Sequence, residues 1–317
     1  MSDLRQRVPG HSLIDMLLHQ WDIGTIRLDA ATNGVVVDDK AVSWYRGVIG
    51  ERRVGTILDS LGTSHTVLHS VPVGKGSSDI DQVVIGRAGV FTINTKYSPG
   101  KKVWVNGYGL FVDGHKQFYV RNSAAEARRA ADLLSEASGL TVPVTALIVF
   151  VDPGPITHKG PAGGGEHDPA IRVLADAELF RVFMDRPQFS DEQVARIVAA
   201  AVRPATWHRS PAESTAGHHI TREFEALEEE VGPHLARAFV APSKVSVPRM
   251  PAPSARDRVG YGRARPNATR NRARSAASRR PASRKRQSYL DRLFSGVAVP
   301  AAGLFGLWIY LNVITGK

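Results

Sequence analysis

The sequence contains no cysteine. This absence excludes a disulfide scaffold, a thiolate zinc site, an iron–sulfur cluster and a cysteine nucleophile. The chain also lacks a Gly-x-Ser-x-Gly hydrolase elbow, and no Gly-Lys-Ser/Thr follows its glycine-rich run Gly160–Gly165, so that run is interpreted as part of a surface loop and not as a P-loop. The first 21 residues carry charges early and lack a long apolar run with a cleavage site, so they do not predict a secretory signal.

Acidic residues are scarce in the C-terminal part of the chain. From Arg249 to Arg292 there are 14 Lys or Arg and two acids, a net charge of +12. The chain as a whole carries +11, so with Lys317 contributing +1 the first 248 residues carry −2. Residues 242–292 are rich in Pro, Ser, Ala and Arg, which predicts a disordered basic linker. Its arginines are suited to anionic lipid beside a membrane, and equally to the phosphates of nucleic acid.

Charge is missing altogether from Leu293 to Gly316, a run of 24 residues. As a helix with a rise of about 1.5 Å per residue, this run would span roughly 36 Å and cross a hydrocarbon core of about 30 Å. Residues 293–317 are therefore expected to form a single-pass C-terminal transmembrane anchor, and the alternative is a buried or partner-binding helix. The basic residues before it predict a cytoplasmic main domain by the positive-inside rule.

The body of the chain has an α/β pattern. Residues 44–209 alternate helical periodicity with short β-rich runs, residues 1–43 form an N-terminal extension with a hairpin or a helix, and residues 210–241 form a helical, polar extension. The expected strands are 65–73, 80–85, 90–95, 102–105, 109–112, 145–151 and 171–174. The expected helices run from residue 44 to about 61 and over residues 123–137, 176–184, 191–201 and 221–239. Residues 154–169 are expected to form a surface loop.

Two pairs of polar residues lie at the ends of neighbouring predicted strands. Asp79 and Asp81 open one strand, and Asn94 and Lys96 close the next. Residues two apart on a strand share a face, so an antiparallel pairing through the turn at residues 86–89 would bring the four side chains together. Carboxylates beside a lysine could hold a divalent cation and stabilise charge on a phosphate, and the alternative is solvated charges or a plain ion pair.

The wider segment resembles a known family. The run WYRGVIGERRVGTILDSL, followed by SSDIDQVVIGRAGVFTINTKYSPGKK, a helix and an apolar strand, is similar to the NERD (nuclease-related) domain over about residues 44–150. The most specific pieces are the Gly50-Glu51 pair expected to open the first helix, the Asp-Ile-Asp segment, and the Gly-Val-Phe-x-Ile run that leads to a lysine. The resemblance implies a restriction-endonuclease-like core of the PD-(D/E)xK type, a mixed sheet flanked by helices.

The resemblance also implies roles for individual residues. Glu51 matches the helix acid, Asp81 the metal-binding aspartate, Asn94 the (D/E) position and Lys96 the lysine of the (D/E)xK element. In such nucleases the acids bind Mg²⁺, for which Mn²⁺ is a possible substitute, and the lysine orients the water or stabilises the transition state. Asn94 departs from the pattern, because a neutral amide is a weaker ligand than a carboxylate, and Asp79 is a candidate to restore the missing charge. Gln82 stands where the family usually has histidine.

The sequence therefore predicts a membrane-tethered, Mg²⁺-dependent phosphodiesterase acting on DNA or RNA. Arg121, Arg128 and Arg129 of the helix after the site are candidates for contacts with the phosphate backbone, and the alternative is that they serve only solubility. The alternative function is a catalytically degenerate, membrane-anchored module that binds nucleic acid or protein. The sequence predicts no oligomeric state.

Overall fold

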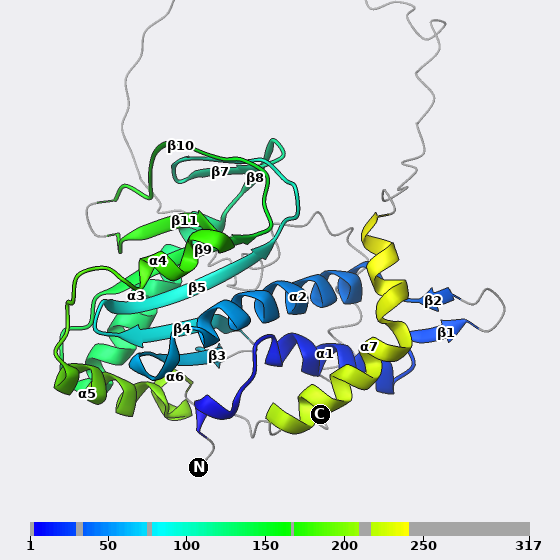
Figure 1. Ribbon diagram of the computed structural model, residues 1–317, viewed down its shortest axis with the longest axis horizontal. Coiled ribbons are helices and arrows are strands. Elements are labelled where there is room, and N and C mark those ends of the chain that lie inside the picture. The colour runs from blue at the N-terminus through cyan, green and yellow to red at the C-terminus, as the bar shows by residue number, and fades with distance from the viewer. Residues whose placement is uncertain (1–2, 30–33, 75–77, 166–167, 209–216, 241–317) are drawn as a thin grey trace, which may run out of the picture. The chain divides into compact units, whose positions relative to one another are not determined.

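The computed structural model describes residues 3–29, 34–74, 78–165, 168–208 and 217–240 (Figure 1). The predicted basic linker at residues 242–292 and the predicted anchor at residues 293–317 lie outside the described residues. Within the described ranges, none of the helices combines the length and the apolar character needed to cross a membrane.

The described elements follow one another in this order: α1 (His11–Asp22), β1 (Arg27–Asp29), β2 (Gly34–Val36), α2 (Asp39–Asp59), β3 (Thr66–Pro72), β4 (Asp79–Gly86), β5 (Gly89–Tyr97), β6 (Val103–Gly107), β7 (Gly109–Val112), β8 (His115–Gln117), α3 (Tyr119–Ser138), β9 (Val144–Val151), β10 (Ile156–Ala162), β11 (Ile171–Ala175), α4 (Leu179–Val182), α5 (Asp191–Ala201), α6 (Pro204–Trp207) and α7 (Gly217–Val240). Short 3₁₀ turns lie at Leu4–Gln6, Gly62–Ser64 and Asp176–Glu178.

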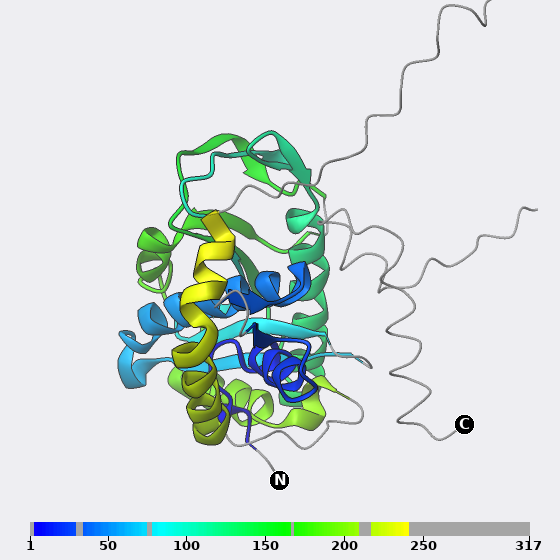
Figure 2. The ribbon, with the colours of Figure 1, turned by 90° about the vertical axis from the view of Figure 1, so that its right-hand side faces the viewer.

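A five-stranded mixed sheet forms the centre, in the order β11-β9-β5-β4-β3. β3, β4 and β5 are antiparallel, whereas β5, β9 and β11 run parallel. Helices α2 and α4 pack on one face of the sheet, and α3, α5 and α6 pack on the other (Figures 1 and 2). The expectation of an α/β fold with a mixed sheet flanked by helices is confirmed.

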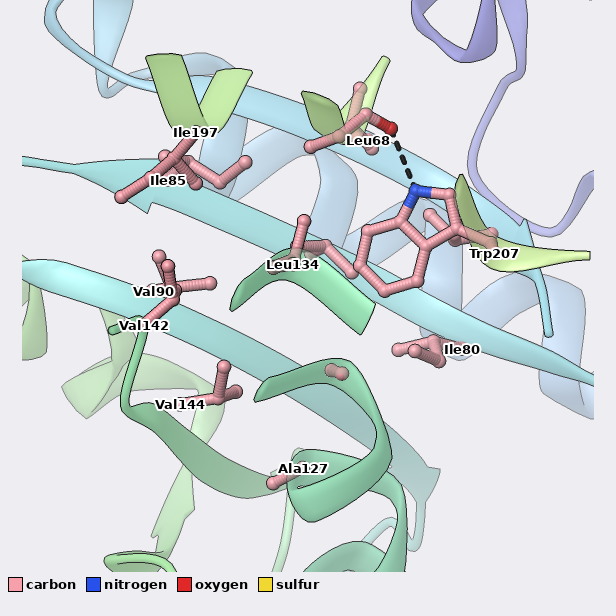
Figure 3. Close-up of a cluster of buried hydrophobic side chains, with 14 of the residues drawn as sticks. Leu68, Ile80, Ile85, Val90, Ala127, Leu134, Val142, Val144, Ile197 and Trp207 are labelled. Carbon is pink, nitrogen blue, oxygen red and sulfur yellow. Dashed lines mark hydrogen bonds between the residues drawn. The ribbon is translucent and has the colours of Figure 1, made fainter. Parts of the chain in front are cut away.

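The core under α3 holds this layer together (Figure 3). Ala127 and Leu134 lie seven residues apart, two turns along one face of α3, and belong to the same apolar cluster as Leu68 and Ile85 of the sheet. The small alanine side chains let the helix approach the strands closely. Trp207 closes the end of this core, and its indole N–H donates to a backbone carbonyl 2.7 Å away.

A second, four-stranded sheet is built mainly from the connection between β5 and α3, in the order β10-β6-β7-β8. The expectation of a surface loop over residues 154–169 is wrong for its central part, because β10 pairs in parallel with β6. β10 has no apolar alternation, and glycine and proline are tolerated in it because it lies at a sheet edge. Its position depends on β6, whose Val103 pairs with Ile156 from 53 residues earlier in the chain, so the local sequence pattern does not reveal it.

The N-terminal extension contains both a helix, α1, and a hairpin, β1–β2. It packs with α2 and α7 around a third apolar cluster. α2 begins at Asp39, where the Asp38 side chain accepts the N–H of Ala41 at 2.7 Å. The Gly50-Glu51 pair therefore lies in the middle of a 21-residue helix, and the expectation that it opens a helix is wrong.

Candidate active site

The site forms where β4 and β5 stop pairing. Their ladder runs from Gly86↔Gly89 to Gln82↔Ile93, and the next residue of β4 is Asp81. Its carboxylate Oδ2 accepts the backbone N–H of Thr95 at 2.7 Å, in place of a strand-to-strand bond. The predicted convergence of the Asp79/Asp81 pair with the Asn94/Lys96 pair rests on this antiparallel pairing, which is confirmed.

The other side of β4 is also irregular at Asp81. The β3–β4 ladder passes from His69↔Gln82 to Val71↔Ile80, so Ser70 and Asp81 interrupt it. Ser70 is buried with a φ of +45°, which residues other than glycine rarely adopt. Its hydroxyl has no hydrogen-bond partner among the described residues. Such strain persists only where the surrounding structure imposes it, and it is common beside functional groups.

Four carboxyl groups influence one another here: Asp79 and Asp81 from β4, Glu51 from α2 and Glu126 from α3. Burial, together with the charges of Asp81 and Asp79, raises the pKa of Glu51 well above its ordinary value. Burial raises the pKa of Asp79 to about 6, and it also raises the pKa of Asp81. Burial and the charge of Asp81 raise the pKa of Glu126 well above its ordinary value. A cation placed among these groups would relieve their repulsion.

Two basic side chains face the carboxyl groups. Lys96 lies at the end of β5 with its Nζ 5.1 Å from the centroid of the Tyr119 ring, and its charge opposes the rise in the pKa of both Asp81 and Glu51. Arg7 lies in the N-terminal segment, residues 3–10, which precedes α1. Its charge opposes the rise in the pKa of Asp79, and its guanidinium donates to Ser12 at 2.8 Å.

The N-terminal segment reaches the site because α2 is glycine-rich on that side. A β-carbon at Gly55 would collide with Pro9, and one at Gly47 would collide with Leu13. Between these two close approaches, Gly10 donates its backbone N–H to Glu51 Oε2 at 3.1 Å. Gly10 has a φ of +77°, so a glycine is suited to this turn.

Asn94 presents its amide to the same space. Its Nδ2 donates to Ser123 Oγ of α3 at 3.3 Å, whereas its Oδ1 is buried with no hydrogen-bond partner among the described residues. Glu126 Oε1 is also buried and lacks a partner there. A buried acceptor without a donor is costly, and a bound cation would satisfy both oxygens.

The donor set fits a hard divalent cation, which prefers carboxylate and amide oxygens. In the part of the chain that the structure describes, however, no three Asp, Glu or His side chains are gathered closely enough to enclose an ion. One of the Asp81 oxygens is already engaged with Thr95. The residues that could hold the ion are Asp81, Asn94, Glu51, Asp79 and Glu126, and side-chain rearrangement would have to complete the coordination.

The three candidate arginines have different surroundings. Arg129 acts on the site, because its charge lowers the pKa of Glu126. Arg128 forms an ion pair with Asp168 at 2.9 Å, and the guanidinium of Arg121 lies 5.9 Å from the centroid of the Tyr108 ring. The structure thus brings one of the three to the carboxyl groups.

Sequence reasoning missed Glu126 and Arg7. Glu126 borders the buried stripe of α3, and an acid beside alanines on that stripe, three residues after the buried Ser123, was a usable signal. Arg7 had no comparable signal, because its place depends on how the N-terminal segment crosses α2.

A match to a family model covers most of the site. Residues 46–151, about a third of the chain, match the family model of the nuclease-related domain, and this range includes all of the site except the N-terminal segment. Threonylcarbamoyl-AMP synthase of Haemophilus influenzae is 39% identical over 57 residues, which are 18% of this chain. The chain spans 31% of the length of that relative. SfsA of Pyrococcus furiosus, solved in complex with Ca²⁺, aligns over 55% of this chain and 57% of its own, at 14% identity and a TM-score of 0.17.

Proposed function

We propose that the nuclease-related domain hydrolyses phosphodiester bonds of nucleic acid with the help of Mg²⁺. The observation that carries the proposal is the placement of Asp81 and Lys96 at the point where β4 and β5 separate, together with Glu51 and Glu126 from helices on opposite faces of the sheet. The mixed sheet flanked by helices supports a restriction-endonuclease-like core for this site.

Each residue has a distinct task in the proposed reaction. Asp81, Asn94 and Glu51 would hold the metal ion, which when bound would activate a water and offset charge at the phosphate. Lys96 places its ammonium group against the negative charge that grows on the phosphate oxygens. Glu126 in its ionised form accepts the proton of the attacking water, because its raised pKa makes the carboxylate a stronger base and its Oε1 has no competing donor among the described residues. Arg129 contacts the phosphate backbone beside it.

The test is cleavage by the full chain of supercoiled plasmid, linear duplex and single-stranded DNA and RNA, with Mg²⁺, Mn²⁺ or EDTA. We expect metal-dependent cleavage of at least one substrate, reduced at least 100-fold in Lys96→Ala. Lys40→Ala is the control, because Lys40 is an exposed lysine at the start of α2. Cleavage that persists in Lys96→Ala, or no cleavage by a folded protein with any metal, would overturn the proposal.

A second candidate function is a module that binds nucleic acid or protein without cleaving it. Asn94 favours this candidate, because a neutral amide stands where the family pattern has an acid. In that case Lys96→Ala would weaken binding modestly and there would be no cleavage to lose.

We also propose that residues 293–317 anchor the protein in a membrane with the nuclease-related domain on the cytoplasmic side. The support is the uncharged run from Leu293 to Gly316 and the arginines that precede it. The arginines of residues 242–292 would then contact anionic lipid. The test is extraction of membranes with alkaline carbonate: the full chain should stay in the pellet, and a chain ending at residue 292 should be released. Release of both would contradict the anchor.

A further inference from the structure

The four-stranded sheet carries a row of side chains that the proposed reaction does not use. The register places Thr157 of β10, Trp104 of β6, Phe111 of β7 and Lys116 of β8 directly opposite one another across the four strands. The rows on either side contain the buried residues Val103, Val105, Leu110 and Val112. The row from Thr157 to Lys116 therefore lies on the outer face of the sheet, and we call it the aromatic row.

Two aromatic side chains stand at the centre of this row. Trp104 is 36% exposed, and its ring meets that of Phe111 edge to face with the centroids 5.5 Å apart. Beside them lies an open pocket of about 460 Å³, lined by Lys102, Val103, Trp104, Phe111, Gly114 and Thr157. Trp104 thus leaves part of its ring open to solvent beside the half-buried ring of Phe111.

The surroundings of the aromatic row are basic. Residues 101–118 and 155–162, which form the sheet, contain Lys101, Lys102, Lys116 and Lys159 and a single acid, Asp113. The Asp113 carboxylate is engaged, because it accepts the backbone N–H of Lys102 at 2.9 Å. At the other end of the row, Lys116 Nζ lies 5.9 Å from the centroid of the Phe118 ring, which is itself exposed. Exposed aromatic faces interleaved with lysines match the bases and phosphates of a single strand.

The sheet is joined to the catalytic site through the chain itself. β5 ends one residue after Lys96 and leads to β6, and β8 leads to Tyr119, the ring above which Lys96 Nζ lies. Figure 1 shows the small sheet beyond the end of β5 at which Lys96 lies. The chain thus connects the small sheet at both ends to the residues around Lys96, through β5 on one side and through Tyr119 of α3 on the other.

We infer that the aromatic row is a stacking platform for single-stranded nucleic acid, which makes single strands the preferred substrate of the adjacent site. The inference about substrate rests on the proposed nuclease function, whereas the binding itself does not. Bases stack on Trp104 and Phe111, and the lysines around them contact the phosphates. Duplexes bind less well, because their bases are already stacked on one another.

The test is photochemical cross-linking of the full chain to a single-stranded oligonucleotide that carries 5-iododeoxyuridine, in EDTA and about 0.3 M salt. The salt weakens binding that depends on phosphate charge alone, such as binding to the arginines of residues 242–292. We expect cross-links at Trp104 or Phe111, located by peptide mass spectrometry. Trp104→Ala should reduce affinity about 5- to 100-fold, and Trp104→Phe should retain most of it. Phe180→Ala is the matched control, since Phe180 is an exposed aromatic residue of α4.

Cross-links confined to other segments, or equal affinity of the protein and Trp104→Ala, would overturn the platform. Trp104→Ala could instead lose self-association while its oligonucleotide binding is unchanged. That result would also overturn the platform, because the aromatic row would then be a contact between two copies of the protein. The two proposals fail separately. Cross-linking at Trp104 by a protein that cleaves nothing would retain the platform and reject the nuclease. Cleavage that depends on Lys96, with no cross-link at the aromatic row, would retain the nuclease and reject the platform.

Discussion

Asp81 Oδ2 accepts the backbone N–H of Thr95 at 2.7 Å, at the point where the ladder between β4 and β5 has ended. The carboxylate thus bridges two strands. Asn94, the neighbour of Thr95, has a buried amide oxygen that no donor among the described residues satisfies. The register of the β4–β5 ladder, continued by one residue, therefore sets Asp81 opposite Asn94.

Asn94→Asp is expected to strengthen metal binding, because a carboxylate is a better ligand for Mg²⁺ than an amide. We predict that the dissociation constant for Mg²⁺ decreases about tenfold or more, measured by isothermal titration calorimetry. Asn94→Ala should weaken binding by a similar factor. If Asn94→Asp bound Mg²⁺ no more tightly than the unchanged protein, Asn94 would not be a ligand.

Glu126→Gln should stabilise the metal-free protein, because it removes one of several mutually repelling carboxyl groups. We predict an increase of about 1 kcal/mol in the free energy of unfolding at neutral pH, measured in urea. Cleavage should decrease at least 100-fold, since the amide cannot accept the proton of the water. Glu136→Gln, a change on an exposed residue further along α3, should alter neither quantity. Unchanged cleavage in Glu126→Gln would remove Glu126 from the reaction.

Ser70→Gly tests the strain opposite Asp81. Glycine adopts a φ of +45° without a steric cost, so we predict a gain in stability of about 1 kcal/mol, measured by urea denaturation. Ser70→Ala is the comparison, because alanine also removes the buried hydroxyl but keeps the strained conformation. An equal gain in both variants would show that the buried hydroxyl, and not the backbone, is the cost.

His69 should make the protein sensitive to acid. Burial lowers the pKa of His69 to about 4, from an ordinary value of 6.5, so the unfolded chain binds a proton at a higher pH than the folded one. Stability that is complete above pH 6.5 is then lost as the pH falls toward 4, by up to about 3 kcal/mol. The raised pKa of Asp79 acts in the opposite direction. Its contribution to the stability of the protein is lost as the pH rises from about 4 to 6.

The contribution of His69 is isolated by comparing the protein with His69→Gln. As the pH falls from 6.5 to 4, the free energy of unfolding of the unchanged protein should decrease relative to that of His69→Gln. The contribution of Asp79 cancels in this comparison, because it is common to both proteins. A difference that did not depend on pH would mean that His69 has the same pKa in the folded and unfolded states.

The sequence could predict only those site residues that lie close together in the chain, on the two strands of one hairpin. A spacing of two residues on adjacent strands was sufficient to bring Asp79 and Asp81 toward Asn94 and Lys96, since a hairpin turn determines the register. Glu126 and Arg7 reach the same carboxyl groups from elements that are distant in sequence, and their arrival depends on how α3 and the N-terminal segment pack. The position of β10 was hidden for the same reason, because its pairing with β6 overrides a sequence typical of loops.

The central claim is that Asp81 and Lys96 act together in metal-dependent phosphodiester hydrolysis. It is tested most directly by the single-turnover rate of cleavage of an end-labelled nucleic acid by the full chain in Mg²⁺, beside Asp81→Asn and Lys96→Ala. Asp59→Asn and Lys40→Ala change exposed residues of the same types on α2 and serve as controls. We predict cleavage by the unchanged protein and both controls, and a loss of at least 100-fold in the two site variants. Equal rates in all five proteins, or no cleavage by any of them while folded, would contradict the account.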